Sequence, residues 1–138
     1  MYQSSPLALY VHLVWGTWER RPLLVKPLET AVHRALVAQC LTLKGEAVAI
    51  GGVADHVHLL VRMPATLSVA ELVKRLKGTS THLVTHQLAP DHFFRWQVGY
   101  GAVTVSPRHI AQVSTYIARQ HEHHAANTAH AALELPHR

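Results

Sequence analysis

Two strand-like segments joined by a tight turn lie at the centre of this chain. Of all the features of the sequence, they place the strongest constraint on its fold. Residues 46–53 and 56–63 are rich in aliphatic and β-branched side chains, and Asp55 marks the turn between them. This pattern predicts a β-hairpin. Any fold proposed for the chain must therefore hold an antiparallel pair of strands in its middle, with the remaining elements arranged around it.

A helix is predicted on each side of the hairpin. Apolar residues recur at spacings of three and four after Pro27, and Gly45 is a suitable end for that helix. After the hairpin, Ser68 and Glu71 have the spacing of a capping box, in which a hydroxyl and a carboxylate satisfy the first amides of a helix. Residues 79–88 continue this second helix less firmly.

Outer strands complete the pattern. Residues 7–15 form an apolar run without breakers, and residues 93–105 are aromatic and β-branched, either as one strand or as a hairpin broken near Gly99. Ser106 and the following proline open a final helix that reaches about His124. The order of elements predicts an α+β fold, the ferredoxin-like or RRM-like split βαβ sandwich. It has an antiparallel sheet and an added C-terminal helix on its second face.

Length, charge and cysteine content narrow the class of protein. The chain has 138 residues, 49% of them hydrophobic, and a formal net charge of +5. We expect one domain at residues 1–125 and an Ala- and His-rich tail at residues 126–138. The single cysteine, Cys40, excludes an internal disulfide, and no apolar run approaches a membrane span. Because no secretory leader opens the sequence either, we expect a cytoplasmic protein with no membrane partner. The basic charge favours nucleic acid.

His56 and His58 form a His-x-His motif inside the second strand of the hairpin. Side chains alternate along a strand, so both imidazoles face one way and can bind a single divalent ion. The motif alone is short, and it is also typical of two satisfied polar positions on a half-buried strand. His12 lies in the first strand, where pairing would set it beside this face, and we expect it to have a structural or substrate-packing role.

Tyr116 and Gln120 lie four residues apart in the final helix and so share a helix face. Taken alone, Tyr116 fits a core or rim aromatic better than a catalytic residue. Together with the histidines, the pair indicates transesterification: a metal polarises a phosphate oxygen, and the phenol attacks phosphorus to form a phosphotyrosine bond. Gln120 is placed to complete the metal shell, and two histidines leave the open positions that catalysis requires.

Five blocks of the sequence, in order, resemble one family. From the N-terminal end they are His12-Leu13-Val14-Trp15 with Arg20-Arg21-Pro22, Asp55-His56-Val57-His58-Leu59-Leu60-Val61, Leu76-Lys77-Gly78-Thr79-Ser80, the segments Trp96 to Gly101 and Val103 to Ser106, and Tyr116-Ile117-Ala118-Arg119-Gln120. Together they are similar to the single-tyrosine HUH transposases of bacterial insertion sequences, which include insertion-sequence-200-like and REP-associated tyrosine transposases.

The resemblance implies a homodimer that cuts single-stranded DNA at hairpin-bearing element ends and rejoins it. It implies Mg²⁺ or Mn²⁺ held by His56, His58 and Gln120, and Tyr116 as the nucleophile that leaves a 5′-phosphotyrosine and a free 3′-hydroxyl. In the insertion-sequence members the nucleophile helix can be lent to the partner subunit.

Basic side chains that would contact DNA phosphates are the last group of predicted site residues. They are Arg20, Arg21, Lys74, Arg75, Lys77 and Arg95. The alternative function is a non-catalytic or domesticated RRM-like protein that binds single-stranded nucleic acid. An RNA-recognition motif is expected to carry aromatic residues on its third strand, where this chain has histidines and aliphatic residues.

Overall fold

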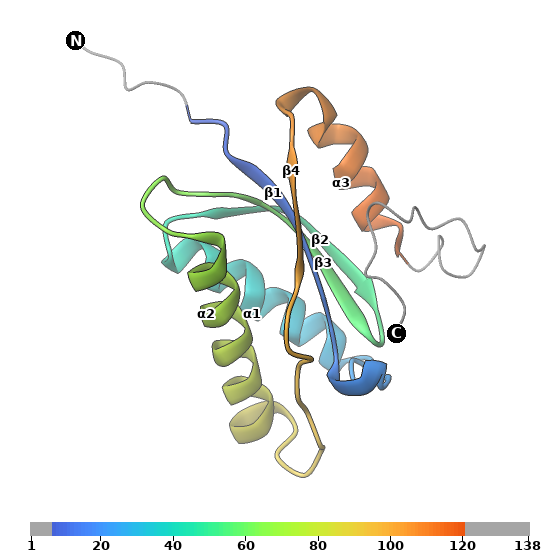
Figure 1. Ribbon diagram of the computed structural model, residues 1–138. Coiled ribbons are helices and arrows are strands. Elements are labelled where there is room, and N and C mark those ends of the chain that lie inside the picture. Colours follow the sequence, from blue (N-terminus) through green and yellow to red (C-terminus); the bar gives the residue numbers. More distant parts are fainter. Residues whose placement is uncertain (1–6, 121–138) are drawn as a thin grey trace.

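The computed structural model describes residues 7–120 of the chain. In chain order, the strands are β1 (Tyr10–Gly16), β2 (Glu46–Val53), β3 (His56–Arg62) and β4 (Gly101–Val105), and the α-helices are α1 (Leu28–Thr42), α2 (Val69–Leu83) and α3 (Ile110–Ala118). Short turns of 3₁₀- or π-helix, η1 (Trp18–Arg20), η2 (Val84–Leu88) and η3 (Pro107–His109), connect them. Figure 1 shows the path of the chain.

The four strands form one antiparallel sheet in the order β2-β3-β1-β4. Strand β1 lies in the middle of it, paired on one side with β3 and on the other with β4. The central hairpin has the predicted bounds at its turn: β2 ends at Val53 and β3 begins at His56. This is the predicted α+β arrangement, a split βαβ sandwich, and the prediction is confirmed.

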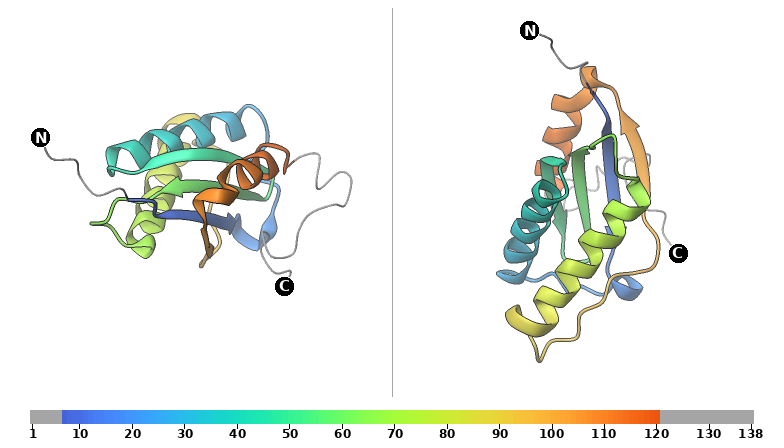
Figure 2. Two further views of the ribbon diagram at one scale, coloured as in Figure 1. Left: turned by 90° about the horizontal axis from the view of Figure 1, so that it is seen from above. Right: turned by 90° about the vertical axis from the view of Figure 1, so that its left-hand side faces the viewer.

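Each face of the sheet packs against different helices because side chains alternate along the strands. Helices α1 and α2 run side by side along one face, and α3 covers part of the other (Figures 1 and 2). The first face holds the larger apolar cluster, which includes Leu13, Trp15 and Leu59, all fully buried. Full burial of each such side chain contributes roughly 1.5–3 kcal/mol, so this face supplies most of the stability.

The second face carries a smaller cluster and the polar residues of interest. Leu60, Val105, Val113, Tyr116 and Ile117 form this cluster between the sheet and α3. The histidines at positions 12, 56 and 58 lie on this same face, since they alternate with the residues of the larger cluster. The added C-terminal helix is therefore where the sequence predicts it, with its tyrosine toward the histidines.

The segment before β4 differs from the sequence prediction. Residues 93–105 were expected to form one strand or a hairpin broken near Gly99, but the strand covers only Gly101–Val105, and Trp96 makes a single isolated bridge to Thr17. The aromatic side chains that raised the β-propensity serve another purpose. Phe94 and Trp96 are buried in the larger cluster, and the indole Nε1 of Trp96 donates to Oγ of Ser80 at 2.9 Å.

The final helix begins with a 3₁₀ turn, and of the part predicted to reach about His124 only residues up to Gln120 are described. Ser106 caps its start, with Oγ accepting from the amide of Arg108 at 3.3 Å, but a 3₁₀ turn precedes α3, and α3 ends at Ala118. Arg119 forms a turn, and Gln120, which is helical again, follows α3. The tail predicted at residues 126–138 lies outside the described residues. No helix within residues 7–120 is long and apolar enough to cross a membrane.

Candidate active site

His56 and His58 project from the same face of β3 into the space beneath α3. Their side chains are 1% and 0% exposed, and their ring centroids are 5.1 Å apart. Val57, between them, points into the larger cluster on the other face. The alternation predicted from the sequence thus holds, and two imidazoles lie together at a buried position on a rigid strand.

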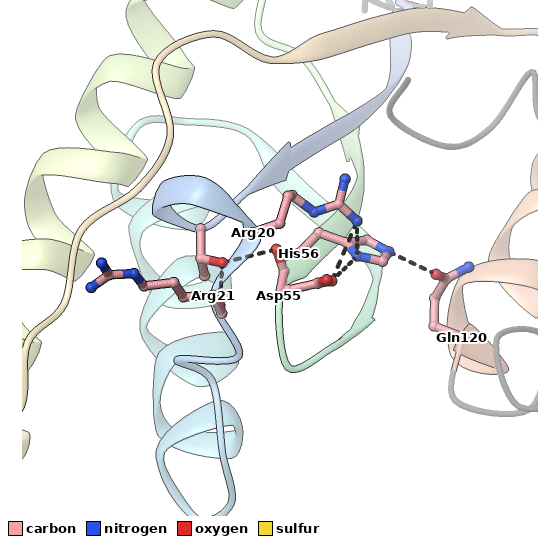
Figure 3. A network of polar contacts seen from close by, with 6 residues as sticks. Arg20, Arg21, Asp55, His56 and Gln120 are labelled. Carbon is pink, nitrogen blue, oxygen red and sulfur yellow. Dashed lines mark hydrogen bonds and ion pairs between the residues drawn. The ribbon is translucent and has the colours of Figure 1, made fainter. Parts of the chain in front are cut away.

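Asp55 and Arg20 hold the first of these imidazoles from the side of the hairpin turn (Figure 3). Nδ1 of His56 lies 2.7 Å from Oδ1 of Asp55, and a guanidinium nitrogen of Arg20 lies 3.4 Å from the same oxygen and 3.2 Å from Nδ1. The 2.7 Å contact to a carboxylate requires a proton between the two atoms, so we assign that proton to Nδ1. Nε2 is then the nitrogen available to a ligand.

The carboxyl of Asp55 is held in its charged form. Partial burial acts to raise its pKa, but the hydrogen bond from His56 and the positive charge of Arg20 outweigh burial and leave the pKa below its usual value. Arg20 reaches this position from a turn in which it adopts φ 55°, in the left-handed region that non-glycine residues seldom occupy. The turn therefore carries some backbone strain that positions this cation.

His12 contacts the second imidazole. Nε2 of His12 lies 2.8 Å from Nδ1 of His58, and the ring centroids are 5.0 Å apart. His12 is 1% exposed and comes from β1, where its register partner is Leu60, two pairs along from the pair of Val14 and His58. The expectation that strand pairing sets His12 beside the histidine face is confirmed.

Helix α3 approaches the sheet closely at Gly51 of β2. A Cβ added to Gly51 would lie 2.1 Å from the carbonyl oxygen of Ile117, which is far inside contact distance. Only glycine leaves room for the helix backbone at this point. The contact between Gly51 and Ile117 therefore sets the distance between α3 and the face of the sheet that carries the histidines.

Tyr116 lies against His58 within the same chain. Their ring centroids are 6.1 Å apart and the rings meet edge to face at 76°. The tyrosine is 6% exposed and belongs to the smaller cluster. The structure thus brings the predicted nucleophile to the predicted metal ligands, in a nearly enclosed position.

Gln120 lies beside His56, beyond the end of α3. Its Oε1 is 3.4 Å from Nε2 of His56, and the side chain is 1% exposed. Figure 3 shows the amide oxygen and the imidazole nitrogen directed toward each other. The nitrogen that Asp55 leaves available therefore points at the predicted third ligand.

These donors fit a divalent metal. Among residues 7–120, no three side chains of His, Cys, Asp or Glu are grouped so as to hold an ion. A metal at this place would take Nε2 of His56, an imidazole nitrogen of His58 and the amide oxygen of Gln120. Nitrogen and neutral oxygen donors suit ions such as Mn²⁺, and Mg²⁺ would complete its shell with water and phosphate oxygens.

The predicted DNA-contacting cations divide between the two sides of the sheet. Arg20 borders the site, and the guanidinium of Arg21 points away from it (Figure 3), lying 3.3 Å from Glu19 and 5.4 Å from the centre of the Phe93 ring. Arg95 is exposed and stacks over Trp18, with 4.1 Å from its guanidinium carbon to the ring centre. Two cation–aromatic pairs thus flank η1.

The cations of α2 lie on the opposite face from the histidines. Lys74 and Arg75 are exposed, and Arg75 forms an ion pair with Glu71 at 3.0 Å. Lys77 is half-buried, and its ammonium donates to the carbonyl oxygens of Gln97 at 2.8 Å and Gly99 at 2.6 Å. Burial lowers the pKa of Lys77. Its charge is thus committed to holding the segment before β4.

Sequence reasoning did not identify Asp55 as a site residue and did not assign Arg20 its place beside His56. Asp55 was interpreted only as a turn residue. Its position immediately before the His-x-His motif is a usable signal, because a carboxylate next to a histidine can bind the ring nitrogen that faces away from the site. The contact of Arg20 depends on the left-handed turn, for which the sequence offers no signal.

The amino-acid sequence matches the protein-family model described as "Transposase IS200 like" over residues 6–120. The chain belongs to the IS200-like transposase family. This confirms the family that the five sequence blocks indicated. The IS200-like transposase is 28% identical over 119 residues to the ISDra2 transposase TnpA of Deinococcus radiodurans, covering 83% of this chain and 85% of that protein.

Two solved structures share the fold. A crystal structure of a candidate transposase from Deinococcus radiodurans R1 superimposes with a TM-score of 0.66 at 26% identity, covering 95% of this IS200-like transposase and 98% of that chain. A REP-associated tyrosine transposase bound to a REP hairpin superimposes with a TM-score of 0.65 at 12% identity, covering 94% of this chain and 74% of that one. The second likeness is one of fold.

Proposed function

We propose that this IS200-like transposase cleaves single-stranded DNA with Tyr116 and rejoins the ends by transesterification. The observation that carries the proposal is the meeting of four buried side chains from two distant segments. Tyr116 lies against His58, and Oε1 of Gln120 lies 3.4 Å from Nε2 of His56. A core tyrosine without a chemical role has no need of an imidazole pair and a buried amide beside it.

His56, His58 and Gln120 would hold the metal, Mg²⁺ or Mn²⁺. When bound, the metal supplies Lewis acidity, which makes the phosphorus of a bound phosphodiester more electrophilic. Asp55 and Arg20 keep Nε2 of His56 directed into the site, and α3 carries the phenol to the same place. The low exposure of these groups limits water, which would otherwise hydrolyse a covalent intermediate.

In the cleavage step, the phenolic oxygen of Tyr116 attacks phosphorus, and the bond from phosphorus to the 3′ oxygen breaks. The phenol loses its proton and the departing 3′ oxygen gains one, leaving a 5′-phosphotyrosine and a free 3′-hydroxyl. A 3′-hydroxyl from another DNA end reverses the step and restores both the phosphodiester and the phenol. One phosphoester bond replaces another, so no high-energy cofactor is required.

DNA would approach the site past η1. Arg20, Arg21 and Arg95 lie there, and Trp18 and Phe93 offer rings on which unpaired bases stack. Lys74 and Arg75 lie across the sheet from the histidines, where they would contact a different part of the substrate, such as the hairpin at an element end. We assign Lys77 a weaker part in DNA binding, because two carbonyl groups already occupy its donors.

We also propose that the protein acts as a homodimer, as the resemblance to insertion-sequence enzymes implies, and that it does so in the cytoplasm. Because Tyr116 is 6% exposed, α3 must shift before a phosphate can reach the phenol. A helix seated on so small a cluster can leave the sheet without unfolding the larger one. Such movement permits action on the chain's own histidines or on those of a partner subunit.

The deciding experiment uses labelled single-stranded DNA from the ends of the element, with and without the hairpin, incubated with the purified protein and Mn²⁺. We expect a slowly migrating labelled band on a denaturing gel, sensitive to protease and dependent on the hairpin. Tyr116→Phe should lose the band and keep hairpin binding. Binding without any covalent product in the unmodified protein would favour the non-catalytic nucleic-acid-binding function instead.

A further inference from the structure

An imidazole that binds a metal uses one ring nitrogen as the ligand, and its other ring nitrogen carries the proton. Free neutral histidine exchanges its proton between Nδ1 and Nε2, and only the deprotonated nitrogen can be a ligand. A buried group that accepts a hydrogen bond from one nitrogen fixes the proton there and frees the other. Each ligand histidine in this site has such a contact, and the two contacts differ in kind.

For His56 the acceptor is a carboxylate. Oδ1 of Asp55 lies 2.7 Å from Nδ1, and Nε2 faces Gln120 on the other side of the ring. The proton therefore lies on Nδ1, and Nε2 is available. Arg20 approaches the same carboxylate at 3.4 Å and helps to hold it.

For His58 the corresponding neighbour is His12, which the function proposed above does not use. Nε2 of His12 lies 2.8 Å from Nδ1 of His58, and both side chains are 1% exposed or less. Two ring nitrogens at this separation share one proton. If the proton is on His58, then His58 donates from Nδ1, and its Nε2 is the nitrogen that carries the lone pair a metal would bind. If the proton is on His12, the Nδ1 atom of His58 is the acceptor.

The short contact argues against His12 as a third ligand. Nε2 of His12 lies at a hydrogen-bond distance of 2.8 Å from Nδ1 of His58, so it is engaged by a different ring nitrogen from the one assigned to the metal. Its contact with His58 is a hydrogen bond.

We propose that His12 is a positioning residue that accepts the Nδ1 proton of His58 and thereby presents Nε2 of His58 to the metal. The proposal rests on the metal site of the proposed function. His12 then keeps its own proton on Nδ1, and no net charge is buried. The hydrogen bond also fixes the rotation of the His58 ring and makes Nε2 a better donor.

A mere packing role for His12 predicts different behaviour from two variants. His12→Phe keeps an aromatic ring of similar size and removes the acceptor. His12→Gln places an amide oxygen at about the distance of Nε2 from the backbone, so it keeps an acceptor while changing the shape. A packing role favours Phe over Gln, whereas a hydrogen-bonding role favours Gln over Phe.

The test measures Mn²⁺ binding by calorimetry without DNA, in the unmodified protein and both variants. We expect His12→Phe to weaken Mn²⁺ binding by about 10- to 100-fold and His12→Gln to weaken it only a few-fold. Thermal unfolding of the metal-free proteins provides the control for folding. Equal losses in both variants, or no loss in His12→Phe, would overturn the proposal.

A second measurement is made on the unmodified protein, and a variant serves only to assign its signal. Nitrogen-15 NMR of the metal-free protein reports which ring nitrogen of His58 carries the proton, with His58→Gln used to assign the signal. We expect the proton on Nδ1, and a proton on Nε2 would overturn the proposal. These readouts do not involve DNA, so a protein that shows them but forms no covalent product would contradict the proposed function alone.

Discussion

The amide oxygen of Gln120 lies 3.4 Å from Nε2 of His56, although 64 residues separate them in the chain. The contact joins the segment after α3 to the sheet on the side away from the larger apolar cluster. Asp55 occupies the other nitrogen of the same ring. The predictions below follow from this arrangement and from the packing that maintains it.

Removing the imidazole of His56 should remove metal binding and cleavage together. We expect His56→Ala to weaken Mn²⁺ binding by more than about 10-fold, because a ligand nitrogen is lost, and to abolish the covalent DNA product. Calorimetry and denaturing gels measure the two effects. His86→Ala, the same change at an exposed histidine in η2, should alter neither. Cleavage by the unmodified protein that survives excess chelator would contradict a metal role.

Gly51→Ala should displace α3 from the sheet. The added Cβ would lie 2.1 Å from the carbonyl oxygen of Ile117, and relieving such overpacking costs about 1–3 kcal/mol of unfolding free energy. We expect the displacement to lower DNA cleavage as well, because Tyr116 rides on the same helix. Urea unfolding and the covalent-product assay measure these effects.

Gly78→Ala is the matched control for that substitution. Nothing lies within 4 Å of a Cβ at Gly78, which is inside α2. Replacing glycine inside a helix should stabilise the protein by roughly 0.5–1 kcal/mol and leave cleavage unchanged. Equal behaviour of the two variants would show that the close approach at Gly51 does not set the position of α3.

Substitutions at Lys77 and Lys74 should distinguish a lysine that stabilises the fold from a lysine that binds DNA. Lys77→Met removes two hydrogen bonds to the segment before β4, and we expect a loss of about 1 kcal/mol in unfolding free energy. Lys74→Ala should leave stability within about 0.5 kcal/mol and lower DNA affinity, with the salt-dependence slope reduced by about 1. Fluorescence anisotropy at several salt concentrations tests the second effect. A lower salt slope for Lys77→Met without any loss of stability would reverse the two roles.

Ionisation of the Cys40 thiol in the unfolded chain should lower the free energy of unfolding at alkaline pH. Burial raises the pKa of its thiol to about 11, so the folded protein keeps the proton that the unfolded chain releases at about pH 8.5–9. Its contribution is therefore fully present below the unfolded pKa and is lost as the pH rises toward 11. Urea unfolding at pH 7, 9 and 10.5 should show a decline, of up to about 2 kcal/mol, that is smaller in Cys40→Ala.

The sequence predicts this fold well where local signals agree with tertiary packing. The hairpin turn at Asp55 and the cap at Ser68 depend on neighbouring residues, and Oγ of Ser68 does accept from the amide of Glu71 at 3.0 Å. Residues 93–100 mislead because their aromatic side chains indicate a strand. In the structure they anchor an irregular segment into the larger cluster, and long-range packing outweighs propensity there.

The candidate site divides in the same way. Alternation along β3 suffices to place His56 and His58 together, and helical spacing suffices to pair Tyr116 with Gln120 approximately. The contact between His12 and His58 depends on the register of β1 against β3, which no local pattern specifies. The place of Arg20 depends on consecutive left-handed residues at Glu19 and Arg20, a conformation that arises from the contacts of the whole turn.

The two apolar clusters differ in size, so one face of the sheet supplies most of the stability and the other carries the candidate active site. One face can tolerate little change, because Leu13, Trp15 and Leu59 are enclosed there by two helices. The other face is covered by one short helix, α3, which packs on the smaller cluster. Substitutions in α3 should therefore change the position of the Tyr116 phenol before they change the stability of the scaffold on the opposite face.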